Sequence, residues 1–135
     1  DIMIPDSAPN YQDDEWRANV RAWMTPLSDD MATLGKYTTN FDLEGMDSRA
    51  RMLKTESGFA LKDSKEFTVS SELEESKREY ESSLADFMTA SDYIISAVEK
   101  LKNNDIEAGT EDLQTANVYI NSGSEHMTAA AEAAA

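Results

Sequence analysis

Two short stretches of the chain decide its fold. "YTTNFDLEGM" runs from Tyr37 to Met46, and "LKNNDIEAGT" runs from Leu101 to Thr110. In both, Asn precedes Asp, an aliphatic residue and Glu, with one extra residue between Asn and Asp in the first stretch. This order is typical of a turn that leads into the capped first turn of a helix. Asp42 and Asp105 are the predicted N-caps. We therefore expect the chain to reverse direction twice by the same turn.

The residues before and after these turns recur as well. At an offset of 64 positions, residues of similar character form pairs: Trp16 with Tyr80, Trp23 with Phe87, and Asn40 with Asn104. Beyond the turn the offset becomes 63, which aligns Asp42 with Asp105 and indicates one residue inserted at the first turn. The sequence thus predicts two copies of one helical hairpin, at about residues 10–67 and 70–134.

Apolar residues follow a spacing of three and four through four long segments, which indicates four amphipathic helices. The chain has five Gly and three Pro, and all three Pro lie within the first 26 residues. Long helices joined by short connections pack as antiparallel neighbours. We expect an all-α, antiparallel up-and-down four-helix bundle over residues 10–135, preceded by an extended lead segment at residues 1–9.

Pro26 lies within the first predicted helix, where proline removes a backbone hydrogen bond. The apolar stripe keeps its phase from Trp23 through Leu27 to Met31, which favours a kinked helix. The alternative is a break, with Thr25 and Pro26 starting a second helical piece.

The last helix has small residues every seven positions, at Gly109, Ala116, Gly123 and Ala130. Such a seam allows a neighbouring backbone or a large ring to approach closely. The aromatic residues of the first helix, Trp16 and Trp23, are its expected occupants.

The chain carries 27 Asp and Glu against 12 Lys and Arg, a formal net charge of −15. This charge argues against nucleic acid and anionic membrane surfaces as partners, because binding to either depends on cations. Without Cys, the chain cannot use thiol chemistry or Cys-ligated metals. No apolar stretch is long enough for an integral membrane segment. Acidic runs such as Asp29-Asp30 are expected on solvated helix faces.

The sequence lacks the motifs of the cofactors and enzymes that helical bundles house. His126 is the single histidine and has no Glu-x-x-His arrangement, so a di-iron centre is not expected. A catalytic triad would have to use the same residue, and no nucleophile-elbow motif is present. We expect no enzyme, no catalytic residue, no metal and no cofactor, and the carboxylates are expected to titrate normally on polar faces.

Binding functions remain. The first hypothesis is a non-enzymatic helical-bundle module that interacts with another protein or the cell surface, or with a second copy in a homodimer. Phe59 and Leu61 lie off the main stripe of the second helix and are its predicted interaction patch. The alternative is a sensor-type bundle that binds a small ligand between helices at its aromatic end. The predicted ligand-binding residues are Trp16, Trp23, Tyr80 and Phe87.

The duplicated hairpins, with "DLQTANVYINSGSEHM" at Asp112–Met127, resemble uncharacterised exported helical-bundle proteins of archaea, including methanogens. The resemblance implies the fold class and an extracytoplasmic location. The Pro-punctuated start "DIMIPDSAPNYQ" is typical of a segment that follows a removed signal peptide or lipid anchor. We therefore expect an exported or membrane-anchored protein.

Overall fold

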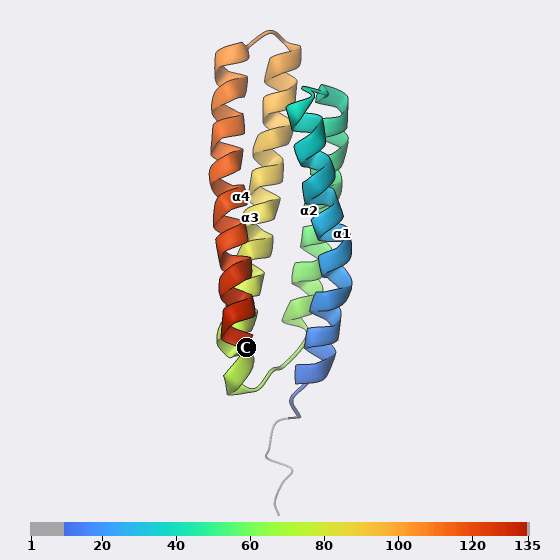
Figure 1. Cartoon of the computed structure of the whole chain (residues 1–135), viewed down its shortest axis with the longest axis vertical. Helices are drawn as coiled ribbons and strands as arrows, with labels where there is room; N and C mark the ends of the chain where they lie inside the picture. Colours follow the sequence, from blue (N-terminus) through green and yellow to red (C-terminus); the bar gives the residue numbers. More distant parts are fainter. Residues whose placement is uncertain (1–9, 135) are drawn as a thin grey trace, which may run out of the picture.

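The computed structural model describes residues 10–134, which form four helices (Figure 1). They are α1 (Asp13–Thr39), α2 (Leu43–Lys65), α3 (Ser71–Lys102) and α4 (Ile106–Ala134). The described residues contain no strand. The predicted lead segment at residues 1–9 lies outside the described part of the chain.

Each helix packs against the next one in the chain, so that α1–α2, α2–α3 and α3–α4 are close neighbours. The predicted antiparallel four-helix bundle is confirmed. The rings of Trp16 in α1 and Tyr80 in α3 meet edge to face across the bundle, with centroids 5.9 Å apart. The α3–α4 hairpin is the longer one and extends past the α1–α2 turn (Figure 1).

The two hairpin turns have the same geometry. Each contains one residue in the left-handed region, Phe41 with φ 52° and Asn104 with φ 62°. The Asp42 side chain accepts a hydrogen bond at 3.0 Å from the amide three residues later, and Asp105 does the same at 3.4 Å. Both predicted N-caps are confirmed, and each satisfies an amide that the helix itself leaves without a partner.

Backbone hydrogen bonds correct the alignment of the turns. The amides of Asn40 and Asn103 both donate to the carbonyl four residues earlier, at 3.0 Å and 3.2 Å. Asn40 therefore corresponds to Asn103 and not to Asn104, as the sequence alignment had it. The turns match at an offset of 63 throughout, so the residue that the sequence alignment inserted at the first turn does not lie within it.

The helix α1 runs unbroken through Pro26, so the predicted alternative of a break at this residue is wrong. Burial on both sides explains the continuity. Trp16, Leu27 and Leu34 are all buried and hold the two halves of α1 against the same core. The cost of a missing hydrogen bond is offset by this packing.

The core is apolar along its centre and contains serines where helices approach closely. Met46, Leu53 and Leu84 are fully buried. Two buried serines of α3 donate to carbonyls of α4, from Ser76 to Ala130 and from Ser83 to Gly123, each at 2.7 Å. None of the described helices has the length and apolarity of a membrane span.

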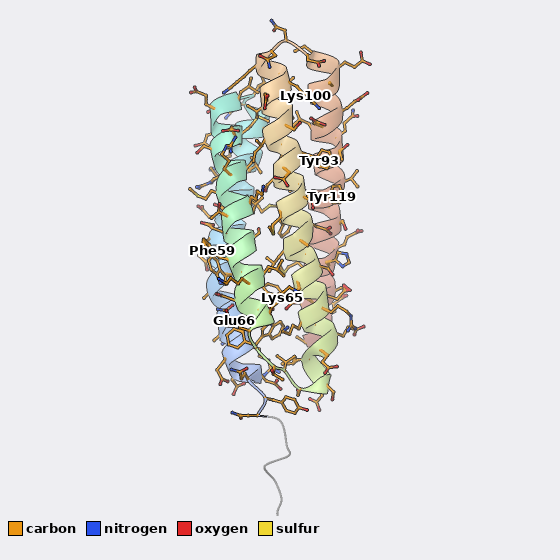
Figure 2. All side chains as sticks on the ribbon, turned by 180° about the vertical axis from the view of Figure 1, so that it is seen from behind. Phe59, Lys65, Glu66, Tyr93, Lys100 and Tyr119 are labelled. Carbon is orange, nitrogen blue, oxygen red and sulfur yellow. The ribbon has the colours of Figure 1, made fainter. Side chains whose placement is uncertain are left out.

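The small-residue seam of α4 is filled from α3. A Cβ atom added at Gly123 would lie 2.6 Å from the Phe87 ring, and one at Gly109 would lie 2.7 Å from Leu101. The expected occupants, Trp16 and Trp23, do not fill these two places. On the outer side of the same helix pair, the Tyr93 and Tyr119 rings stack 5.9 Å apart (Figure 2).

Candidate functional site

Trp16 and Tyr80, two of the predicted ligand-binding residues, lie together at the end of the bundle where α1 begins. Both are buried, with 3% and 1% of their surface exposed. The Trp16 indole donates to Ser64 Oγ at 3.0 Å, and Ser64 donates to Glu81 Oε2 at 2.7 Å. This chain of hydrogen bonds fixes the Trp16 ring between α1, α2 and α3.

Trp23 points to another interface. Its indole nitrogen donates to Asp63 Oδ2 at 2.8 Å, and the Asn19 amide donates to the same oxygen at 3.1 Å. These two hydrogen bonds, led by that from Trp23, lower the pKa of Asp63. Trp23 is therefore a polar link between α1 and α2 and does not line a hollow of the aromatic end.

Two hollows lie between α1 and α4 at this end and in the middle of the bundle. Trp16 and Tyr80 line one of about 310 Å³, and Phe87 lines the next, of about 350 Å³. The four predicted ligand-binding residues are thus separated. Three of them line hollows between α1 and α4, and Trp23 lies at the α1–α2 interface. The Tyr80 hydroxyl is buried without a hydrogen-bond partner among the described residues.

Asp30 was not predicted as a site residue, yet it is the most buried carboxylate, with 2% of its surface exposed. It projects from α1 toward α2, where Arg49 Nε lies 3.5 Å from its Oδ1. Burial, followed by a hydrogen bond with Glu56, raises the pKa of Asp30 to about 7. The expectation that every carboxylate lies on a polar face and titrates normally is wrong at this position.

Asp30 faces Glu56, and the carboxyl proton of Asp30 stabilises the contact between them. Asp30 Oδ2 and Glu56 Oε1 are buried and lack a partner when both groups are ionised. A proton between the two carboxyl groups gives these oxygens a hydrogen bond and removes one buried negative charge. Arg49 compensates for the remaining buried negative charge and also donates a hydrogen bond to Asp29 Oδ2 at 3.0 Å. The arrangement is a buried, proton-dependent contact between α1 and α2.

Phe59 and Leu61, the predicted interaction patch, behave differently from each other. Phe59 is 55% exposed on the outer side of α2 (Figure 2). Leu61 is partly buried and packs against the core. The exposed surface therefore continues from Phe59 toward α3, where a shallow hollow of about 620 Å³ includes Met88 and Ile95.

The hollow beside Phe59 is basic. Its charged lining residues are Arg51, Lys54 and Lys62, and it contains no carboxylate. We call these three residues and Phe59 the α2 face. The whole of α2 has five Lys and Arg against four Asp and Glu, a net charge of +1, whereas α4 has five acidic residues and no Lys or Arg. The α2 face is a cationic and aromatic surface on a strongly acidic protein.

Comparisons of the chain with protein-family models, curated proteins and solved structures find no match. Within residues 10–134, no three side chains of His, Asp or Glu converge as metal ligands would. The candidate sites are therefore defined by geometry and charge alone.

Proposed function

We propose that this protein is a helical-bundle interaction module whose α2 face binds an acidic protein partner. The observation that carries the proposal is Phe59, a large aromatic side chain that is 55% exposed beside three basic residues. Protein interfaces are enriched in aromatic residues and Arg, so Phe59 beside Arg51 matches their composition.

Charge complementarity favours an acidic partner. Most of the molecule is acidic, so an acidic protein approaching at random is repelled by much of the surface and attracted at the α2 face. Lys54 pairs with Asp92 at 2.7 Å and Arg51 pairs with Asp47 at 3.0 Å. These pairs are exposed and weak, so a partner carboxylate can replace them at small cost.

Photocrosslinking tests the proposal directly. A benzoylphenylalanine at position 59 should give one discrete crosslinked protein in the host cell, through an acidic segment of that protein. Val118 is the matched control, because it is 64% exposed on α4, the helix without Lys or Arg. The adduct from position 59 should weaken in Lys62→Glu. Equal adducts at both positions, or an adduct only to a second copy of this chain, would overturn the proposal.

Paired substitutions separate binding from folding. Phe59→Ser should reduce partner binding at least tenfold and change the free energy of unfolding by less than about 0.5 kcal/mol, since the ring is exposed. Leu61→Ser should destabilise the fold, because Leu61 packs against the core. If Phe59→Ser unfolds the protein, the ring is structural and the α2 face is not an interaction surface.

A further inference from the structure

The side of α1 that faces α4 is not packed as closely as the other neighbouring pairs of the bundle. Three hollows lie along this side, of about 310, 350 and 330 Å³. They join end to end, because Met24 and Met127 line both the first and the second, and Met31 lines both the second and the third. Together they form one groove along the bundle, with α3 as its floor.

The groove is mainly apolar. Its walls carry three methionines, at Met24, Met31 and Met127, and its floor includes Phe87 and Ile94. Methionine side chains adapt to flexible ligands of varying shape, because they have three rotatable bonds and a polarisable sulfur. Each hollow has the volume of a small-molecule site. An elongated apolar ligand fits this shape better than a compact polar one.

The charges of the groove are of one sign. The charged residues that line it are Arg17 and Arg21, four positions apart on α1, and no carboxylate lines any of the three hollows. This absence is notable in a chain with 27 Asp and Glu. Residues four apart lie on the same face of a helix, so both guanidinium groups border the first hollow.

The two arginines are accessible to a ligand. Arg17 pairs with Asp14 at 3.3 Å, but that carboxylate is 96% exposed, so the pair is weak. Arg21 forms no ion pair with any carboxylate of residues 10–134. Guanidinium groups bind carboxylates with two parallel hydrogen bonds, which favours this head group over a neutral one.

We propose that the α1–α4 groove binds a long-chain carboxylate, with its head group on Arg17 and Arg21 and its hydrocarbon chain along Met24, Met127 and Met31. The site is distinct from the α2 face, and neither proposal depends on the other. Burial of the hydrocarbon chain supplies most of the affinity, because each methylene group removed from water adds to it. The arginines select the anionic head and fix the direction of the chain.

The methionine methyl groups make the proposal testable by NMR. In protein labelled with carbon-13 at the methionine methyls, hexadecanoate added below its micellar concentration should shift the signals of Met24, Met31 and Met127. Met52 is exposed on α2, and Met88 of α3 lines the hollow beside Phe59. Both lie outside the groove, so their signals should not shift. Uniform shifts, or shifts of Met52 and Met88 alone, would overturn the site.

Variants test the head group and the chain separately. Arg17→Gln with Arg21→Gln should weaken hexadecanoate binding at least tenfold and leave hexadecanol binding unchanged. Both arginines lie at the rim, so the fold should persist, as circular dichroism would show. Ser124→Trp, an exposed position that lines the middle hollow, should block both ligands. Equal affinity of the native protein for hexadecanol and hexadecanoate would overturn the head-group assignment.

A membrane lipid offers a similar combination of chain and negative charge. Vesicles of phosphatidylglycerol should leave the methionine signals unchanged, because a lipid within a bilayer does not present its chains to a groove. If the vesicles shift the three groove methyls and hexadecanoate does not, the ligand is a membrane lipid and the proposal is wrong.

Discussion

The two hairpins of this bundle are held together by different means. In α3–α4, small residues allow close contact, and the Phe87 ring occupies the space above Gly123. In α1–α2, polar side chains link the helices beside the apolar core, through Trp23 with Asp63 and Arg49 with Asp30. A similar apolar pattern in two hairpins therefore does not determine how their helices contact each other, because the residues at the contact positions differ in size and polarity.

This difference accounts for the open side of the bundle. The α3–α4 hairpin buries its seam completely, whereas α1 is attached to α2 by directed polar contacts and borders a groove toward α4. Directed contacts tolerate a wider separation than close packing does, because side chains span the distance. We infer that α1 is the movable wall of the groove and that α3–α4 is its rigid frame.

The largest loss of stability is expected in the α3–α4 hairpin, where the two helices are most closely packed. Gly123→Leu places a side chain where even a Cβ atom would lie 2.6 Å from the Phe87 ring, and should cost at least about 3 kcal/mol of unfolding free energy. Gly35→Leu is the matched change on α1, where nothing lies within 4 Å of an added Cβ. It should be neutral or slightly stabilising in urea denaturation. Equal losses in both variants would contradict the comparison.

The next effect concerns the carboxyl proton of Asp30. Its pKa in the folded protein, about 7, lies above the ordinary value of 3.8, so the folded state holds an extra proton between these values. The associated stability is complete below about pH 4 and is lost as the pH rises through 7. Asp30→Asn should remove most of this pH dependence. At pH 8 it should raise the free energy of unfolding by about 2 kcal/mol.

Asp29→Asn is the control for this measurement. Asp29 also binds Arg49, but its side chain is 69% exposed. Its replacement should leave the pH dependence of the urea midpoint as in the native protein. An Asp30→Asn variant that keeps the native pH dependence would show that the Asp30 carboxyl is not its source.

A smaller effect is expected at Asp63, which accepts hydrogen bonds from Trp23 and Asn19. Asp63→Ala should cost about 1.5 kcal/mol, because both donors lose their partner. The pKa of Asp63 is lowered, so this contribution is present above the ordinary value and is lost as the pH falls below it. The pH dependence thus has the opposite sign to that of Asp30. Thermal unfolding of the variant and native proteins at pH 3 and pH 7 measures it, and an equal loss at both would contradict the assignment.

The smallest effect belongs to His126, whose Nδ1 lies 3.0 Å from Glu79 Oε2. This hydrogen bond raises the pKa of His126 above its ordinary value of 6.5. Its stabilisation is present at lower pH and is lost as the pH rises through the raised value. Because the pair is partly exposed to solvent, His126→Gln should cost less than about 0.5 kcal/mol at pH 6. An NMR titration in Glu79→Gln should return the imidazole toward pKa 6.5; an unchanged titration would assign the shift to another group.

The sequence predicted the helices and turns well because these depend on local patterns. Asp42 and Asp105 cap the helices that their spacing indicated. Ser57 and Ser64 each lie four residues after an apolar residue of α2, Leu53 and Ala60, and both are fully buried. Local hydrogen bonds and apolar periodicity determine these features, so one chain suffices to find them.

The candidate sites were predicted less well because they depend on how the helices pack. Asp30 was assigned to a solvated face by its chemistry, although it lies three residues after Leu27 and four before Leu34, on the apolar stripe. That spacing was the signal of its burial. Trp23 was assigned to the aromatic end, but its indole nitrogen donates a hydrogen bond to Asp63 on α2. The groove itself had no signal, since its width is set by contacts between helices far apart in sequence.

Native-state hydrogen exchange, followed amide by amide, tests the central claim that α1 is the movable wall and α3–α4 the rigid frame. Amides of α3 that lie beside α4 should exchange only through global unfolding. Amides in the middle of α1, near Asp30, should exchange through a partial opening of lower free energy, and this free energy should fall further between pH 5 and pH 8. Equal exchange free energies in α1 and α3 at both pH values would show that α1 is as rigid as α3.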